Sequence, residues 1–127
     1  VAPKQKMKIL VTGASGLLGR AVLKAFKDCG HEATGTALTR LKNGLLKMDL
    51  ENKDEIHRLI LELRPEIVVH TAAERRTEEC ERDPERAMRI NADATGALGA
   101  ASREVGAWVL LISTHAVFDG SAGPYSP

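Results

Sequence analysis

Three evenly spaced glycines, Gly13, Gly16 and Gly19, form the part of the sequence best suited to chemistry. They lie between an apolar run, Lys8–Thr12, and an amphipathic run that begins at Leu17. Glycine permits sharp turns and the close approach of another group, and the N–H groups of a first helical turn attract anions. We therefore expect a sharp turn at Gly13, close approach of a ligand at Gly16 and tight helix packing at Gly19.

The N–H groups around this turn are expected to bind a pyrophosphate. Those of Gly16, Leu17 and Leu18 are predicted to be unpaired and to face a crevice, with the positive end of the helix dipole behind them. Ser15 adds a hydroxyl donor. A plain strand–helix turn is the alternative, but such a turn usually needs one glycine rather than three at this spacing. The motif therefore predicts a dinucleotide site.

The choice between NAD and NADP depends on the end of the next strand. An Asp or Glu there would accept hydrogen bonds from the adenosine ribose and favour NAD. Residues 36–40 read TALTR and contain no acid, whereas Arg40 offers a planar cation for the extra 2′-phosphate of NADP. Lys42 adds a second positive charge nearby. NADP is thus the expected cofactor and NAD the less favoured one, with a solvated surface arginine as the alternative role for Arg40.

The order of the remaining elements determines what these motifs can reach. Short β-rich or apolar runs predict strands at residues 8–12, 31–38, 45–48, 66–71 and 108–113. Apolar positions at helical spacing predict helices at residues 17–29, 52–63 and 83–105. Buried strands that alternate with helices indicate an α/β fold with a doubly wound parallel sheet. Right-handed crossovers from the first strand give the expected strand order 3-2-1-4-5.

Composition excludes several classes of protein. A net charge of +1 provides no field that would steer the chain to nucleic acid or to a membrane surface, so neither is expected as a partner. No apolar run reaches the roughly 18 residues of a membrane span. Cys29 and Cys80 are expected as reduced thiols rather than as a disulfide, and the four histidines lack the spacing of metal ligands. His70 is expected in a strand with its ring hydrogen-bonded. We expect a cytoplasmic protein, with the nucleus as a second compartment.

Five segments together resemble the extended short-chain dehydrogenase/reductase family. They are VTGASGLLG at the first turn, MDL after the third strand, VVHTAA on the fourth, INADATGAL in the last helix and LISTHAVFDG after the fifth strand. The resemblance spans about Lys8 to Tyr125 and implies a Rossmann-like sheet truncated after its fifth strand. Residues 1–127 would then form one incomplete NAD(P)-binding domain that lacks the C-terminal substrate-binding part. The uncovered edge at the fifth strand predicts low stability or association with a partner.

Within this family the sequence is most similar to two groups of members, the reductases that make dTDP-rhamnose and the regulatory β subunits of methionine adenosyltransferase. The segments HTAAERR and GLLGRAV favour the second group. That resemblance implies a non-catalytic, NADP-binding regulatory subunit of S-adenosylmethionine biosynthesis, within one-carbon metabolism. Its partner would be the catalytic subunit of methionine adenosyltransferase. The alternatives are an N-terminal fragment of an NADP-dependent dTDP-4-dehydrorhamnose reductase and a fragment with no activity of its own.

The resemblance also implies which residues contact each part of the cofactor. These are Ser15, Gly16, Leu17 and Leu18 for the pyrophosphate and its ribose, Leu38, Thr39 and Arg40 for the adenosine ribose and its phosphate, Asp49 and Leu50 for the adenine, Thr71, Ala72 and Ala73 for the nicotinamide half, and Arg75 for a phosphate or ribose. Asp49 has an alternative role as a helix cap. Arg75 has an alternative role in a solvated charge pair with Arg76.

The catalytic set that the family uses is incomplete in this sequence. Asn91 would brace the active-site region, with an ordinary helix-surface amide as the alternative. Ser113 and Thr114 match the family's hydroxyl, and Thr114 is the better candidate, as a vestige. Ala116 stands where the family usually has tyrosine, and Tyr125 is not followed by the lysine of a Tyr-x-x-x-Lys pair. Because that pair supplies the proton during hydride transfer, we expect no such reaction from this chain alone.

Overall fold

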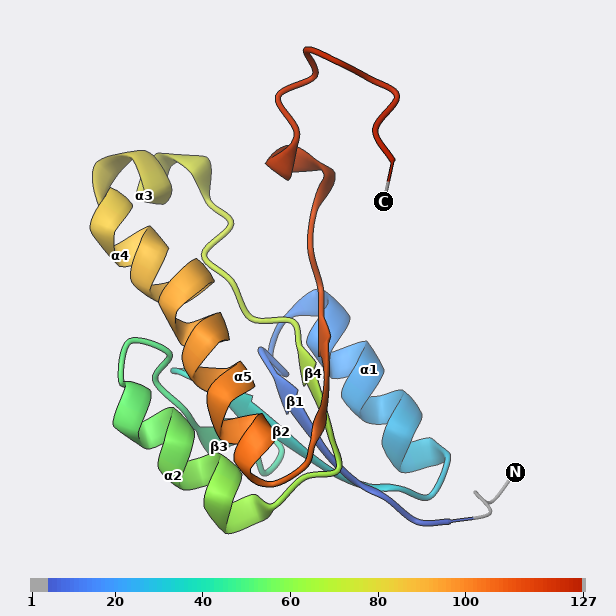
Figure 1. The fold of residues 1–127 in the computed structure, drawn as a ribbon. Coiled ribbons are helices and arrows are strands. Elements are labelled where there is room, and N and C mark those ends of the chain that lie inside the picture. Colours follow the sequence, from blue (N-terminus) through green and yellow to red (C-terminus); the bar gives the residue numbers. More distant parts are fainter. Residues whose placement is uncertain (1–4, 127) are drawn as a thin grey trace.

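A single parallel sheet organises the protein in the computed structural model, which describes residues 5–126 (Figure 1). Its strands are β1 (Lys8–Thr12), β2 (Glu32–Ala37), β3 (Leu46–Lys47), β4 (Ile67–His70) and β5 (Trp108–Leu111). All neighbouring strands are parallel, and their order is β3-β2-β1-β4-β5. The predicted fold class and strand order are therefore confirmed.

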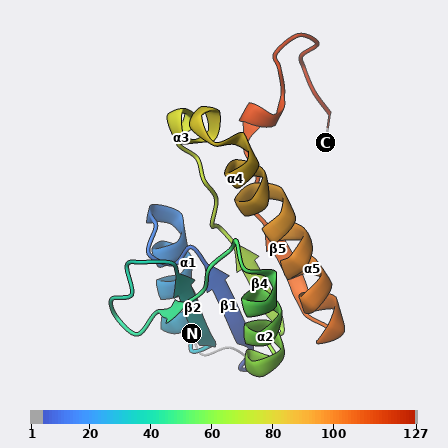
Figure 2. The same ribbon diagram turned by 90° about the vertical axis from the view of Figure 1, so that its left-hand side faces the viewer.

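Helices cover both faces of this sheet. The helical segments are α1 (Leu17–Asp28), α2 (Lys53–Leu63), α3 (Thr77–Arg82), α4 (Pro84–Met88), a π-helical turn (Arg89–Asp93), α5 (Ala94–Glu104) and a short 3-10 turn (His115–Val117). Figure 2 shows α1 alone on one side of the strands, with α2 and α5 together on the other. None of the described helices is both long and apolar enough to cross a lipid bilayer.

Side chains that alternate between the two faces of the central strands divide the core into two halves. In β1, Leu10 packs with α2 and α5, whereas Ile9 and Val11 pack with α1. In β4, Val68 and Val69 divide in the same way. Successive strand residues point to opposite faces, so strands covered on both sides are apolar throughout. The sheet is thereby fixed between two helical layers, and only the ends of its strands are free to form a site.

The residues at the helix ends have the geometry expected of helix caps. Gly30 follows α1 with a φ of 84°, the left-handed conformation predicted for it. Asn52 caps α2, because its side chain accepts a hydrogen bond from the N–H of Glu55 at 3.1 Å. The helix ends at Leu63, as predicted, with Arg64 as its C-cap before Pro65. Cys29 and Cys80 are both free thiols.

The region 77–105 differs from the predicted single helix over 83–105. An additional helix, α3, ends at Asp83, whose side chain then caps α4 by accepting from the N–H of Arg86 at 2.9 Å. Between α4 and α5, residues 89–93 form a π-helical turn. Such a turn inserts one extra residue into a helix and occurs often at functional sites. The helical path is therefore interrupted near the carboxyl ends of the strands.

The β5 edge of the sheet carries exposed apolar side chains. Trp108 is 61% exposed, Leu110 41% and Leu111 50%. No further strand pairs with β5 within residues 5–126. After β5, the chain rises away from the sheet toward the C-terminus (Figure 1). An apolar edge at the fifth strand was predicted, and it is present.

Candidate functional site

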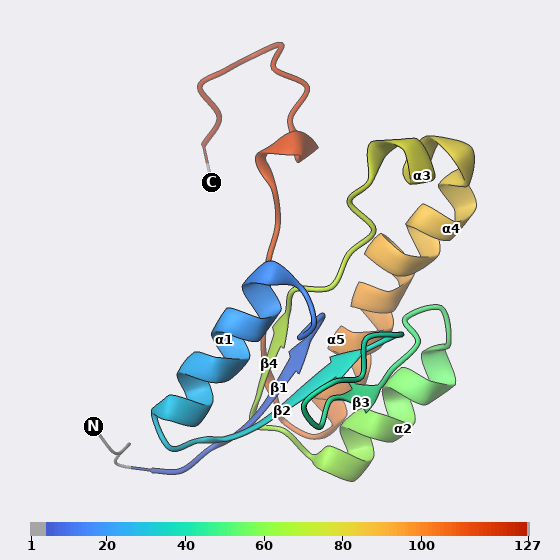
Figure 3. The ribbon, with the colours of Figure 1, turned by 180° about the vertical axis from the view of Figure 1, so that it is seen from behind.

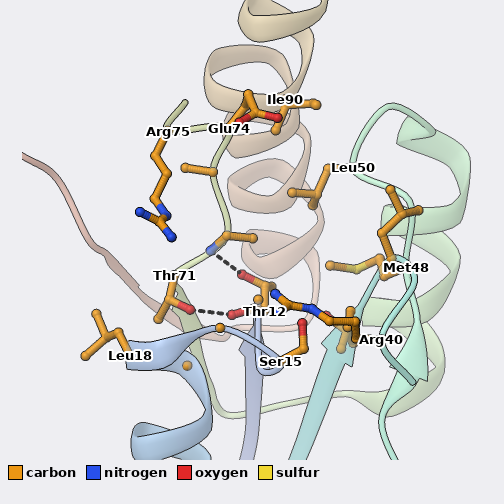
Figure 4. Close-up of a pocket in the computed structure, with 18 of the residues that line it drawn as sticks. Thr12, Ser15, Leu18, Arg40, Met48, Leu50, Thr71, Glu74, Arg75 and Ile90 are labelled. Atoms are coloured by element: carbon orange, nitrogen blue, oxygen red, sulfur yellow. Dashed lines mark hydrogen bonds between the residues drawn. The ribbon is translucent and has the colours of Figure 1, made fainter. Parts of the chain in front are cut away.

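A cavity of about 910 Å³ lies at the carboxyl ends of the strands (Figure 4). It is lined by the glycine loop before α1 and by the segments that follow β2, β3 and β4. The chain leaves β1 in one direction to reach β2 and crosses to the other side to reach β4. Ligands of open α/β sheets bind at such a reversal of strand order, and the volume is typical of small-molecule sites.

The three positions in the loop differ in why they hold glycine. Gly13 has a φ of +64°, and a Cβ there would lie 2.9 Å from the backbone of Ala72. A Cβ on Gly19 would overlap the carbonyl of Gly13 and lie 2.7 Å from Thr71 Oγ1. Gly16 is extended, and the nearest atom to its Cβ position is the oxygen of Gly13 at 3.2 Å. Packing therefore requires Gly13 and Gly19, whereas at Gly16 the space beside the backbone is largely open.

The N–H groups of the loop are only partly available, which corrects the prediction. The N–H of Gly16 donates to the carbonyl of Gly13 at 3.0 Å, so it does not face the cavity as an unpaired donor. This bond closes the tight turn that Gly13 begins. The N–H groups of Leu17 and Leu18 have no acceptor within the described part of the chain. These two donors, at the positive end of α1, are the ones available to an anion.

Hydrogen bonds between the ends of β1 and β4 form the floor of the cavity. Thr71 Oγ1 donates to the carbonyl of Thr12 at 2.7 Å, and the N–H of Ala72 donates to Thr12 Oγ1 at 3.4 Å (Figure 4). The hydroxyl of Thr12 also shares a hydrogen bond with Nδ1 of His70, 2.6 Å away. Burial lowers the pKa of His70, and its ring is hydrogen-bonded as predicted. Thr12 was not among the predicted site residues, although it ends a predicted strand.

The arginines that line the cavity fall into two groups. Arg76 is paired with Glu74 at 2.7 Å, and Arg86 is paired with Glu51 at 3.0 Å. Arg40 and Arg75 also line the cavity but have no carboxylate partner among residues 5–126. Arg75 and Arg76 are both exposed, as the alternative role for them expects, but only Arg76 is paired with a carboxylate. Figure 4 shows Arg40 and Arg75 on different sides of the cavity.

Asn91 fixes the segment that follows β4. Its side-chain Oδ1 accepts from the N–H of Glu74 at 2.8 Å, and its Nδ2 donates to the carbonyl of Glu74 at 2.9 Å. The carboxylate of Glu74 is nearly buried, with 10% of the side chain exposed. Hydrogen bonding from Arg76 lowers the pKa of Glu74 to about 2. Asn91 thus braces the wall of the cavity, as the family resemblance implied, and is not simply a surface amide.

Most of the predicted cofactor-binding residues line this cavity. Those that do are Gly13, Ser15, Gly16, Leu17, Leu18, Gly19, Leu38, Arg40, Asp49, Leu50, Thr71, Ala72, Ala73 and Arg75. Thr39 and Lys42 are not among the lining residues. The prediction missed Thr12, Ala21, Thr36, Ala37, Met48, Glu51, Glu74, Arg76, Arg86 and Ile90. That the predicted residues contact a cofactor stays a prediction.

Asp49 does not cap α2, because Asn52 does so. Instead, its Oδ1 accepts from the N–H of Glu51 at 2.9 Å and holds the turn after β3. Leu50 follows it on the cavity wall, with Met48 and Ile90 as further apolar lining (Figure 4). This part of the cavity is an apolar slot beside a carboxylate, which suits a flat heterocycle with an amino group.

The candidate catalytic residues lie elsewhere. Thr114 is exposed and is not among the residues that line the cavity, and its hydroxyl accepts from the N–H of Ala116 at 3.2 Å. The hydroxyl of Tyr125 donates a hydrogen bond to Oδ1 of Asp119 at 2.9 Å, and its ring stacks on Phe118. Among the described residues, no cluster of His, Cys, Asp or Glu is arranged to hold a metal ion.

Comparisons with known proteins show what the chain is similar to. A family model described as the RmlD substrate binding domain matches residues 7–127. The chain is 38% identical over 118 residues to methionine adenosyltransferase 2 subunit beta of Bos taurus, covering 93% of this chain and 35% of that protein. It is 37% identical over 126 residues to dTDP-4-dehydrorhamnose reductase of Streptomyces griseus, covering 98% of this chain and 39% of that protein.

A solved structure extends this likeness to the fold. The dTDP-4-dehydrorhamnose reductase of Bacillus anthracis, in complex with NADP, matches with a TM-score of 0.81 and 26% identity. The match covers 95% of this chain and 41% of that one. The chain therefore spans well under half the length of these relatives.

Proposed function

The chain belongs to the RmlD substrate binding domain family, and from this premise we propose that its cavity binds NADP without itself carrying out hydride transfer. The observation that carries the proposal is a set of unpartnered hydrogen-bond donors around the cavity, two of which are cationic side chains. Arg40, Arg75 and the N–H groups of Leu17 and Leu18 all lack a protein acceptor within the described residues. Unpaired positive groups that converge on one cavity favour an anionic ligand.

The positions of these groups suit the three phosphates of NADP. The N–H groups at the start of α1 would hold the pyrophosphate, since a helix N-terminus stabilises anions. Arg40, after β2, would bind the 2′-phosphate that distinguishes NADP from NAD. Arg75, on the side of β4, would bind a phosphate or ribose oxygen. NAD lacks the group that Arg40 would recognise, so it is the less favoured ligand.

The apolar slot would take the adenine. Leu50 would pack against the base, and Asp49 would accept from its amino group through the oxygen not held by Glu51. Thr71, Ala72 and Ala73 line the opposite side and would approach the nicotinamide half. When bound, NADP supplies a hydride-transferring ring. The residues described above would bind and orient it.

The candidate catalytic residues named above lie outside the cavity in the described part of the chain. Thr114 is exposed outside the cavity lining, and Tyr125 is held in a turn by Asp119. We propose a regulatory subunit that binds the catalytic subunit of methionine adenosyltransferase. The proposal is supported by the relative of Bos taurus, whose name identifies it as a beta subunit of that enzyme. Its place would be S-adenosylmethionine biosynthesis, in the cytoplasm and also in the nucleus.

A second candidate function is favoured by the match to the reductase of Streptomyces griseus. Under this alternative, the chain is the nucleotide-binding part of an NADP-dependent dTDP-4-dehydrorhamnose reductase. The nucleotide site is the same in both proposals, and only the rest of the protein differs. Turnover of a dTDP-4-keto sugar would therefore select the reductase, and co-purification with methionine adenosyltransferase would select the regulatory subunit.

Titration with NADP and with NAD, followed by thermal melting, tests the shared part of both proposals. A nucleotide at one hundred times its dissociation constant stabilises the fold by about 2.7 kcal/mol. We expect NADP to raise the melting midpoint at lower concentration than NAD does. If neither nucleotide raises it, the cavity is not a nucleotide site in this chain.

A further inference from the structure

One arginine links two separate loops of the cavity. Arg86, in α4, donates from Nε to Oε2 of Glu51 at 3.0 Å. Its Nη1 lies 3.6 Å from Oε2 of Glu74. Glu51 lies in the loop after β3, whereas Glu74 lies in the loop after β4. The two carboxylates are thus joined through a single guanidinium that belongs to neither loop.

The position of this link follows from the strand order. Strands β3 and β4 are separated by β2 and β1, so the two loops start roughly 14 Å apart at the usual strand spacing. Glu51, Glu74 and Arg86 all line the cavity, so the link runs along its boundary. Figure 3 shows the chain before α2 rising beside the helical column that contains α4 and α5.

The link is reinforced at both ends and is partly withdrawn from water. Arg89 makes a second contact to Glu51, with Nη2 3.1 Å from Oε1, and Arg76 makes a second contact to Glu74. The exposed fraction of the side chain is 32% for Arg86, 29% for Glu51 and 10% for Glu74. Charge-assisted hydrogen bonds of this kind are stronger than neutral ones, and partial burial reduces their screening.

We propose that the Glu51–Arg86–Glu74 link is a preformed roof over the nucleotide cavity, and that Arg86 is the positioning residue that keeps it closed. The proposal rests on the nucleotide binding proposed above. The roof is complete without a ligand, so binding need not order the two loops, and this preorganisation favours affinity. Arg86 acts through the two loops and is not itself required to contact the nucleotide.

A preformed roof makes a prediction about rates that a general loss of stability does not make. A ligand enters when the roof opens, and the closed roof then delays its release. Loss of the link should therefore raise both rates, and the dissociation rate should rise more than the association rate. A variant that merely unfolds in part would lower the fraction of competent protein and leave the dissociation rate unchanged.

The experiment compares wild type with Arg86→Met by stopped-flow fluorescence of NADPH on the full chain. We expect the dissociation rate to rise about tenfold, which corresponds to loss of one charged hydrogen bond, and the association rate to rise about twofold. Arg86→Lys should have rates between those of the wild type and Arg86→Met. Its ammonium group can reach one carboxylate but cannot bridge two in the same way. The matched control is Arg58→Met, which removes an exposed pair with Glu62 on α2. An unchanged dissociation rate in Arg86→Met would overturn the proposal.

A second measurement separates this proposal from nucleotide binding. Hydrogen exchange without ligand should become faster in both loops, residues 49–52 and 72–76, in Arg86→Met and also in Glu51→Gln. The second variant removes the negative charge at one end of the link with little change of shape, and it serves if Arg86→Met fails to fold. Unchanged exchange in both loops contradicts a roof. Failure of the wild type to bind NADPH contradicts the proposed function, while the exchange result still decides whether the link restrains the loops.

Discussion

The side-chain amide of Asn91 makes two hydrogen bonds to the backbone of one residue, Glu74. It accepts from the N–H at 2.8 Å and donates to the carbonyl at 2.9 Å. Asn91 lies in the π-helical turn, and Glu74 lies in the loop that follows β4. The helix that passes the cavity therefore holds the cavity wall through one amide.

Replacing this amide should loosen the wall. We expect Asn91→Ala to lower the free energy of unfolding by about 1–2 kcal/mol, because two backbone groups lose their partners. NADP binding should also weaken, since the segment from Thr71 to Glu74 is no longer fixed. Chemical denaturation and nucleotide titration measure the two effects. Thr95→Ala is a control on the same helical segment, because its hydroxyl bonds only to the carbonyl of Asn91. Equal effects of the two substitutions would contradict a special role for the amide.

The two later glycines of the loop should respond differently to a methyl group. Gly19→Ala should destabilise the fold by about 1–3 kcal/mol, because its Cβ overlaps the carbonyl of Gly13. Gly16→Ala needs only a small adjustment of the same carbonyl, so the melting midpoint should change little. NADP binding should nevertheless be lost in Gly16→Ala if phosphate approaches the backbone there. Normal NADP binding by a folded Gly16→Ala protein would show that the ligand does not come close to this residue.

Arg40 should determine the preference for NADP over NAD. Arg40→Met removes the proposed partner of the 2′-phosphate, and the dissociation constant for NADP should rise at least tenfold, as expected for one charged hydrogen bond of about 1.5–3 kcal/mol. The constant for NAD should stay nearly unchanged. Isothermal titration with both nucleotides measures the difference, and Lys42→Met is the control because Lys42 does not line the cavity. Parallel weakening of both nucleotides would argue against this role.

The stability of the protein should depend on the ionisation of Glu74. Hydrogen bonding from Arg76 lowers the pKa of Glu74 from 4.5 to about 2. The folded state therefore favours the carboxylate, which stabilises the fold fully above pH 4.5 and loses its contribution as the pH falls through about 2. Glu74→Gln should flatten the pH dependence of the unfolding free energy in this window.

A matched control for this pH dependence lies in the C-terminal turn. The pKa of Asp119 is also lowered to about 2, chiefly by the N–H of Ser121, but Asp119 is exposed to solvent. Asp119→Asn should change the profile less, because exposed interactions are weak and screened. A larger effect of Asp119→Asn than of Glu74→Gln would contradict the assignment.

The exposed β5 edge should make stability depend on protein concentration. Apolar edges associate, so the melting midpoint should rise as the protein is concentrated. Leu110→Lys places a charge on this edge and should remove the dependence without moving the core, because Leu110 is 41% exposed. Thermal melts at several concentrations measure the effect. A high midpoint that is the same at all concentrations would show that the edge does not associate.

The strand order and the main helices were predictable because each depends on local patterns and on the handedness of crossovers. Gly30 follows α1 because glycine readily adopts a positive φ, and Asn52 precedes α2 because its side chain caps the helix. Both signals are local to the sequence. The hydrogen bond from Gly16 to Gly13 was not predicted, because the spacing of the glycines does not reveal which turn they form. α3 was missed because TEECER has no apolar periodicity.

The cavity walls contributed by distant segments could not be predicted from local patterns. Glu51 and Arg86 are 35 residues apart and meet only in the folded chain, where α4 lies beside the loop after β3. The π-helical turn has no signature in RINAD that separates it from an ordinary helix. Thr39 was expected at the site from the family resemblance, but it is not among the residues that line the cavity.

The π-helical turn at 89–93 also limits how the length of this segment can change. Asn91 must reach Glu74, while Ala94, Leu98 and Ala101 further along are fully buried in the core. Each residue of a helix adds a rotation of about 100°, so removing one residue here would turn one group or the other out of place. Sequence variation in this stretch should therefore consist of replacements, and single-residue gaps should be absent from functional homologues.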